Sequence, residues 1–306
     1  MKTVIIGGGG FVGQYLSARL LATDGDLSEL VLVDQIALPP ANDGRVTAVS
    51  GNFADPALLE TYVKGANTVY LLASILGGAA EANYPLARRI NVDASLSLIE
   101  FLRDSNPNTR LVFASTIAVY SKPMPDVVTD ETPLGPTMVY GAQKLMLETA
   151  ISNFAVRGWL DGVSLRLSGV MARDGADARL KSAFMSRVFY AVMRGEDIVL
   201  PVHPDSKTWL TSVDAAAVNF AHGGMISAEL LGQKRAFTLP ALHVSFAELV
   251  DALFRRFPTS SSKVTFEPDA ELVGLFGSYP QLRTDIASGL GFKADADADD
   301  LVRRSI

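Results

Sequence analysis

The chain has 306 residues, of which 48% are hydrophobic and 20% charged, a balance typical of a globular protein with a sizeable core. Its formal net charge of −6 and its lack of basic blocks argue against nucleic acid and anionic membranes as partners. No apolar run approaches the roughly 18 residues that cross a bilayer. The absence of cysteine excludes disulfides, zinc–thiolate sites and cysteine nucleophiles, and it is compatible with the cytoplasmic location that we expect.

The chain opens with a β-branched run that changes abruptly into glycines, VIIGGGGFVG (4–13). Gly7, Gly10 and Gly13 stand three apart, between a predicted strand and a predicted helix. Glycines at this spacing permit a tight turn, close approach of the backbone to a pyrophosphate and close packing of the helix. The helix N-terminus then offers free N–H groups to the phosphates. The sequence therefore predicts a dinucleotide-binding loop.

Short apolar runs in the first half of the chain predict strands at 3–6, 30–34, 46–49, 68–73, 110–115 and 162–167. These runs lack polar alternation, as do strands that are buried on both faces. Helical patterns lie between several of them, including a helix that starts at Asp55 and Pro56 and a longer one over 86–103. Alternating strands and helices predict an α/β fold, a Rossmann-type doubly wound parallel sheet with helices on both faces.

Asp34 ends the second predicted strand, 21 residues after Gly13. An acid at this position can accept hydrogen bonds from both ribose hydroxyls of an adenosine, and it would repel a 2′-phosphate. Residue 35 is a glutamine, so no basic residue is present there to hold such a phosphate. We therefore expect NAD rather than NADP as the cofactor.

Tyr140 and Lys144, in YGAQK, lie one helical turn apart on one face of a predicted helix. By itself this spacing is also compatible with a surface tyrosine and a solvated lysine. Upstream, however, Ser115 and Thr116 end a predicted strand, at the sheet edge where ligands bind in such folds. The chain thus combines a glycine loop, a strand-end acid, a strand-end Ser/Thr pair, a tyrosine and a lysine in that order.

After residue 168 the pattern loosens into helices near 181–194 and 213–222, strands at 197–200 and 235–239, and a helix that starts with the capping box SFAE at 245–248. The acidic run ADADADD (294–300) is expected to be a solvated turn or a helix start.

We expect residues 1–167 to form an NAD-binding domain, with elements near 205–240 returning to it. Residues 168–204 and 241–306 are expected to form a smaller, interwoven substrate-binding region.

The ordered set of motifs resembles the extended branch of the short-chain dehydrogenase/reductase superfamily, which contains NAD-dependent epimerases, dehydratases and dehydrogenases. Asn91 in RINVDAS matches the helix asparagine of that branch. The resemblance implies that Tyr140 takes the hydroxyl proton of the substrate while hydride passes to the nicotinamide. Lys144 and the nicotinamide cation would lower the pKa of Tyr140, and Lys144 would also hold the nicotinamide ribose. Thr116 would hold the substrate oxygen, with Ser115 as its competitor.

Further motifs narrow the resemblance to the D-erythronate dehydrogenase group: ASILGGAAEANY, STIAVY, RGWLDGVSLRL, WLTS (209–212), FEPD (266–269) and GLGF. That group oxidises the 2-hydroxyl of a four-carbon sugar acid with NAD. The resemblance therefore implies an oxidoreductase that acts on the CH–OH group of a small sugar acid or 2-hydroxy acid, and a homodimer.

The candidate cofactor-binding residues are Gly7, Gly10, Phe11, Val12, Gly13, Asp34, Asn52, Phe53, Leu72, Ala73, Asn91, Tyr140 and Lys144. The candidate substrate-binding residues are Ser74, Thr116, Arg173 and Lys207. Asn52 stands where the branch more often has an aspartate near the adenine.

The segment LSGVMARDGADARLK departs from the group's pattern, in which a proline-containing stretch precedes an RPGKPN-like loop. Of that loop this chain keeps Arg173 and Gly175, and it has two additional acids, Asp174 and Asp177. A carboxylate substrate needs a cationic partner, and a bidentate guanidinium at Arg173 would provide one. The alternative is that Arg173 pairs with Asp174 or Asp177 at the surface, in which case Lys207 is the second candidate.

Two other functions stay open at this point. The first is a nucleotide-sugar epimerase, or another extended reductase with the same Tyr/Lys chemistry, although the acid typical of dehydratases is missing, since Ile117 and Ala118 follow Thr116. The second is a non-catalytic dinucleotide sensor, which would have no reason to keep Tyr140 and Lys144 together. No metal is expected, because none of the three histidines has the spacing of a metal ligand: His203, His222 and His243.

Overall fold

A computed structural model of the chain describes residues 1–39, 42–175 and 181–306. A seven-stranded, entirely parallel sheet forms its larger part, in the order β11-β7-β5-β4-β1-β2-β3. The strands are β1 (Lys2–Ile6), β2 (Glu29–Asp34), β3 (Val46–Ser50), β4 (Thr68–Leu71), β5 (Arg110–Thr116), β7 (Asp161–Leu167) and β11 (Ala236–Thr238). The predicted doubly wound sheet is confirmed, and its strand order reverses between β1 and β4, where ligands bind in such folds.

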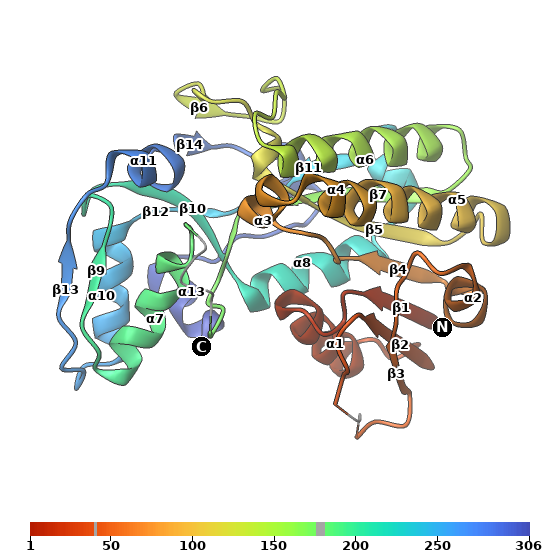
Figure 1. The fold of residues 1–306 in the computed structure, drawn as a ribbon, viewed down its shortest axis with the longest axis horizontal. Coiled ribbons are helices and arrows are strands. Elements are labelled where there is room, and N and C mark those ends of the chain that lie inside the picture. The colour runs from red at the N-terminus through yellow and green to blue at the C-terminus, as the bar shows by residue number, and fades with distance from the viewer. Residues whose placement is uncertain (40–41, 176–180) are drawn as a thin grey trace.

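Helices cover both faces of this sheet (Figure 1). The principal helices are α5 (Ser95–Ser105) and α6 (Val139–Val156) on one face, and α1 (Phe11–Thr23) and α8 (Val213–Met225) on the other. Successive residues of β1 show why both layers form. Val4 and Ile6 lie in the core that α5 and α6 share, whereas Ile5 lies in the core of α1 and α8. A strand with apolar side chains on both sides needs a cover on both sides.

Shorter elements complete this part: α2 (Pro56–Leu58), η1 (Leu59–Val63), α3 (Gly77–Ala82), α4 (Tyr84–Ala87), η2 (Arg88–Ala94), η3 (Ile117–Val119), α9 (Ala228–Leu231) and α12 (Asp285–Gly289). Asp55 caps α2 as predicted, because its carboxylate accepts from the Ala57 amide at 2.9 Å. The helix predicted over 86–103 is present as α4, η2 and α5 in succession, with a wider π-helical turn at η2.

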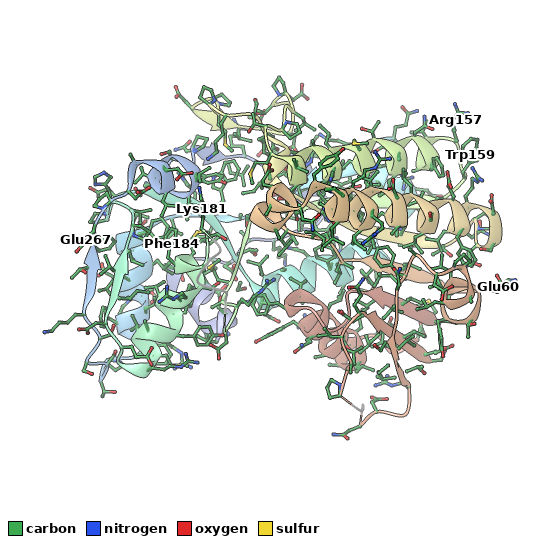
Figure 2. All side chains as sticks on the ribbon, viewed as in Figure 1. Glu60, Arg157, Trp159, Lys181, Phe184 and Glu267 are labelled. Carbon is green, nitrogen blue, oxygen red and sulfur yellow. The ribbon has the colours of Figure 1, made fainter. Side chains whose placement is uncertain are left out.

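The smaller part contains the sheet β12-β10-β8, the pair β13-β9 and the helices that pack against them (Figure 1). These elements are β8 (Gly169–Met171), β9 (Ile198–Leu200), β10 (Lys207–Ser212), β12 (Leu242–Ser245), β13 (Val264–Phe266), α7 (Phe184–Arg194), α10 (Phe246–Arg256) and α13 (Ala298–Ser305). Phe184 packs in its core against Phe246 and Phe276, with ring centroids 5.6 and 6.0 Å apart (Figure 2). The predicted capping box is present, since Ser245 and Glu248 bond reciprocally.

Four further elements lie near the junction of the two parts or at their edge. They are the paired strands β6 (Val127–Val128) and β14 (Gln281–Leu282), and the short helix α11 (Ala270–Leu272) with the π-helical η4 (Val273–Gly277) that follows it.

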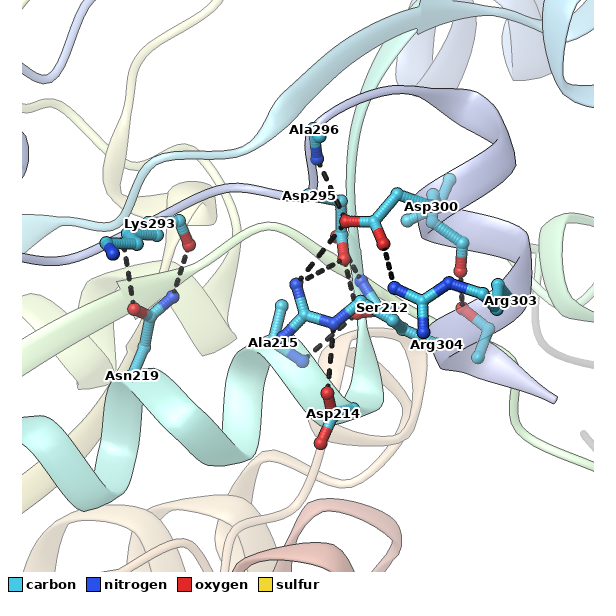
Figure 3. A network of polar contacts seen from close by, with 12 residues as sticks. Ser212, Asp214, Ala215, Asn219, Lys293, Asp295, Ala296, Asp300, Arg303 and Arg304 are labelled. Atoms are coloured by element: carbon cyan, nitrogen blue, oxygen red, sulfur yellow. Dashed lines mark hydrogen bonds and ion pairs between the residues drawn. The ribbon is translucent and has the colours of Figure 1, made fainter.

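The acidic run at 294–300 is only partly the solvated helix start that the sequence predicts. Asp297 caps α13, but the Asp295 carboxylate is completely buried. It accepts hydrogen bonds from the Ser212 amide at 2.8 Å and the Ser212 hydroxyl at 2.6 Å, and it pairs with Arg304 at 3.1 Å (Figure 3). Because Ser212 caps α8 and lies 83 residues upstream, no local pattern could indicate this contact. The C-terminal segment is thereby fastened to the start of α8.

Candidate active site

The glycine loop packs too closely for side chains. Gly7 has a φ of +93°, and a Cβ atom there would lie 2.8 Å from the Ala73 amide nitrogen, at the end of β4. A Cβ atom on Gly13 would lie 2.2 Å from the Gly7 carbonyl oxygen. The residue at the N-cap of α1 is Gly10, which has no side chain to cap the helix. The N–H groups of the first turn therefore remain available to phosphate oxygens, as the motif predicts.

Asp34 lies at the carboxyl end of β2, beside this loop. Its Oδ2 atom accepts from the Gly9 amide at 3.0 Å, and its side chain stays partly exposed. Asn52 lies nearby and is exposed, but its side chain closes its own turn by accepting from the Ala54 amide at 3.0 Å. Phe53 is buried in the core, so it could face a cofactor only through its backbone. Of these three candidates, only Asp34 presents a side chain directly beside the loop.

The segment that follows β4 runs alongside the glycine loop. The amides of Leu72 and Ala73 both donate to the Ile6 carbonyl, at 2.9 and 3.0 Å. The strand predicted to continue to residue 73 ends at Leu71, and the chain then turns to present Ser74. Leu72, Ala73 and Ser74 are all partly buried.

Tyr140 stands at the start of α6, among polar side chains from three other parts of the chain. Burial raises the pKa of its phenol to about 12, while hydrogen bonding with Ser74 and Thr116 and the charge of Arg173 act in the opposite direction. Thr116 comes from the carboxyl end of β5 and Ser74 from the turn after β4. Ser74 and Thr116 therefore both lie beside the Tyr140 hydroxyl.

Lys144 is 1% exposed and lies one turn further along α6. Its ammonium donates to the Ala114 carbonyl at 2.7 Å and lies 4.6 Å from the Phe113 ring centroid. Burial lowers the pKa of Lys144 to about 7, and the Glu148 carboxylate opposes this shift. The expected lowering of the Tyr140 pKa by Lys144 does not show in the chain alone, because burial prevails there and the cation that acts on the phenol is Arg173.

Arg173 follows β8 and reaches back over the glycine-loop helix. Its guanidinium carbon lies 5.5 Å from the centroid of the Phe11 ring, and its charge acts on Tyr140. Asp174, one of its two expected surface partners, instead pairs with Arg194 at 2.9 Å. The other, Asp177, lies outside the described residues. A cavity of about 190 Å³ adjoins Arg173, and its lining includes Arg187, Tyr190 and Arg194 of α7 but none of Ser74, Thr116 and Tyr140.

Lys207, the second candidate for a carboxylate, lies elsewhere. It is exposed at the start of β10, where its charge acts on Glu248 at the start of α10. Among the residues that the structure describes, Arg173 is the cation that acts on Tyr140, so Arg173 remains the first candidate.

Two other candidates are engaged with the protein itself. The Ser115 hydroxyl donates to Glu148, on the opposite side of β5 from Thr116, so Ser115 is not the competitor that the sequence suggested. Asn91 is buried, and its amide joins the Ile75 backbone to the Gln143 side chain. Asn91 thus holds the turn after β4 against α6 and has little capacity left for a cofactor.

Sequence reasoning missed Glu148, which is buried beside this cluster. The signal that could have found it was a third polar residue at helical spacing, one turn beyond Lys144. Val12 lies partly buried in the first turn of α1. Among the described residues, no group of three or more His, Asp or Glu side chains could hold a metal ion, and no helix is long and apolar enough to cross a membrane.

A sequence model of the NAD dependent epimerase/dehydratase family matches residues 3–221. The chain belongs to this family. The match covers the glycine loop, Asp34, Thr116, Tyr140 and Lys144. As a member of the family, the protein is an NAD-dependent oxidoreductase. The residues present fit NAD, because the closely packed glycine loop leads into a helix whose N-terminus has no side-chain cap, and because an acid stands beside the loop.

Several relatives are similar to this member of the epimerase/dehydratase family over nearly its full length. A D-erythronate dehydrogenase of Cupriavidus necator is 35% identical over 99% of this chain and 97% of its own length. A D-erythronate dehydrogenase of Haemophilus influenzae is 29% identical over 100% and 99%. A solved nucleoside-diphosphate-sugar epimerase from Agrobacterium tumefaciens superposes with a TM-score of 0.90 at 29% identity, over 99% of this chain and 92% of that one.

Proposed function

We propose that the protein oxidises a secondary hydroxyl of a small sugar acid or 2-hydroxy acid, with D-erythronate as the model substrate. The observation that carries this proposal is the position of Arg173, whose charge acts on the Tyr140 hydroxyl from beside the glycine loop. A guanidinium there can bind a carboxylate while the neighbouring hydroxyl carbon faces Tyr140. The full-length likeness to two D-erythronate dehydrogenases supports the same substrate class.

We assign the cofactor contacts as follows. The glycine loop and the first turn of α1, with Phe11 and Val12, would hold the pyrophosphate, Asp34 the adenosine ribose, and Lys144 the nicotinamide ribose. NAD, when bound, supplies the ring carbon that accepts a hydride from the alcohol carbon. The smaller part, residues 168–204 and 241–306, would enclose the substrate.

The side chains around Tyr140 would perform the proton chemistry. Ser74 and Thr116 would hold the reacting oxygen, and Tyr140 would take its proton. A phenol with a pKa of about 12 is a poor base at neutral pH, so the reaction requires positive charge close to it. The guanidinium of Arg173 already favours the phenolate, and the ammonium of Lys144 and the nicotinamide cation would add to this effect once NAD is bound.

The decisive experiment is a screen for NADH formation over C4–C6 aldonic, uronic and 2-hydroxy acids. Net NADH formation with an acid supports the proposal. Conversion of a sugar nucleotide without net NADH would indicate an epimerase, which the family and the Agrobacterium structure also allow. Cofactor binding without any turnover would indicate a sensor.

Replacing Arg173 should impair substrate binding. Lysine keeps the charge but loses the bidentate geometry, so we expect KM for the best acid to rise in Arg173→Lys and to rise further in Arg173→Ala. Steady-state kinetics of both variants measure this. Unchanged KM values in both would move the carboxylate site elsewhere.

The cofactor preference should depend on Asp34. We expect the wild-type protein to bind NAD more tightly than NADP, since the Asp34 carboxylate would repel a 2′-phosphate. Asp34→Ala should reduce that preference more than it affects folding. Calorimetric titration with both dinucleotides measures the ratio, and equal or tighter binding of NADP by the wild type would contradict the assignment.

We also propose a cytoplasmic homodimer. Met146 and Val156 are exposed apolar side chains on α6, and their burial against a second copy of the chain would account for them. Light scattering of the purified protein tests the oligomeric state.

A further inference from the structure

A buried ion pair lies directly behind the proposed proton-transfer site, and the proposed function does not use it. Glu148 is 2% exposed and Arg166, from β7, is 8% exposed. The guanidinium contacts both carboxylate oxygens, with Nε 2.9 Å from Oε1 and a terminal nitrogen 2.7 Å from Oε2. The Ser115 hydroxyl donates to Oε1 as well. The carboxylate is therefore held in one orientation from two neighbouring strands.

This carboxylate is also placed to act on Lys144. Glu148 follows Lys144 by four residues on α6, so the two side chains lie on one face of the helix. The Lys144 ammonium is bound by the Ala114 carbonyl, and Glu148 is bound by the hydroxyl of the next residue, Ser115. Two successive residues of β5 thus hold the lysine and the acid.

Stability alone does not explain an ion pair at this position. Isolating two charges from water costs several kcal/mol per ion, and a well-packed apolar pair often serves folding equally well. An apolar pair could not, however, compensate the charge of a buried lysine. Lys144 lies over the Phe113 ring, near the Tyr140 phenol, with Arg166 behind Glu148. In the described part of the chain, Glu148 is the anionic group whose charge acts on Lys144.

We propose that Glu148 is a positioning residue, which keeps Lys144 protonated and in place for the Tyr140 hydroxyl and the nicotinamide ribose, while Arg166 and Ser115 hold the Glu148 carboxylate. This inference rests on the proposed roles of Tyr140 and Lys144. It extends the site from the residues that would touch substrate or cofactor to a buried layer between α6, β5 and β7.

Three variants separate a charge effect from a merely structural one. Glu148→Gln removes the anion and leaves Arg166, so Lys144 should lose its proton at a lower pH. Arg166→Gln leaves the anion and should move the same ionisation to a higher pH. In the double variant Glu148→Gln/Arg166→Gln the pair has no net charge, as in the wild type. The pH at which Lys144 loses its proton should therefore return most of the way to the wild-type value.

The readouts are the pH dependence of NADH binding and of kcat/KM. In Glu148→Gln we expect NADH affinity and kcat/KM to begin their decline at a pH about one unit lower than in the wild type. On the alkaline side of the profile, this shift corresponds to about a tenfold loss of each. An unmoved profile in Glu148→Gln, or shifts of the same sign in both single variants, would overturn the proposal.

Two controls keep the test decisive. Thermal unfolding shows whether each variant folds, because breaking a buried pair is costly. Where Arg166→Gln does not fold, Glu148→Gln is compared with the double variant, since these two differ only in the charge of Arg166. Failure to restore the profile in the double variant would then overturn the proposal. NADH binding needs no acid substrate, so failure of the sugar-acid assignment leaves this test intact.

Discussion

Tyr140→Phe is expected to lower kcat by roughly 10²–10⁴-fold, the range typical of losing a general base. The phenol lies among Ser74, Thr116 and Arg173, and it is the ionisable hydroxyl on which the charge of Arg173 acts. The ring would remain and keep its contact with Lys144, whose ammonium lies 5.6 Å from the ring centroid. Affinity for NAD should therefore change little.

Steady-state kinetics on the best acid and calorimetric titration with NAD measure the two effects separately. Tyr84→Phe is the matched control, because Tyr84 is an exposed tyrosine on α4 that loses the same hydroxyl away from the cluster. If Tyr140→Phe retains more than half of the wild-type turnover, Tyr140 is not the general base. Lys144→Ala, by contrast, should impair both turnover and NAD binding, because the lysine would support the proton chemistry of Tyr140 and also hold the nicotinamide ribose.

Asp295→Ala is expected to destabilise the protein by about 3–5 kcal/mol, the usual cost of removing one partner from a buried charged network. The variant leaves the Ser212 amide, the Ser212 hydroxyl and the Arg304 guanidinium without their common acceptor (Figure 3). The start of α8 and the C-terminal helix α13 would both loosen. Thermal unfolding measures the loss, which should lower Tm by on the order of 10 °C.

Asp299→Ala tests whether position in the fold, rather than charge, decides the effect. Asp299 belongs to the same acidic run, but its side chain and that of its partner Arg255 are both more than half exposed. Exposed ion pairs contribute little to stability, so the Tm of this variant should be close to that of the wild type. Equal losses in the two variants would mean that the buried network is not what holds α13.

The sequence alone was sufficient for much of what depends on residues close together along the chain, although it did not lead us to Glu148, one turn beyond Lys144. The glycine loop, the acid at the end of β2 and the spacing of Tyr140 and Lys144 are local patterns, and each element type follows from its own stretch of residues. A parallel sheet also brings the carboxyl ends of its strands to one edge, so the strand-end position of Thr116 already indicated that it would lie near a ligand site.

The tertiary structure decided what depends on neighbours from distant parts of the chain. Alternation along β5 separates Ser115 from Thr116, but only the packing of α6 shows which of the two faces Tyr140 and which faces Glu148. The approach of Arg173 to Phe11 depends on how β8 enters the smaller sheet. Burial, which raises the pKa of Tyr140 and removes Asp295 from water, is a property of the assembled chain, because desolvation depends on every group that surrounds a side chain and not on its neighbours in sequence.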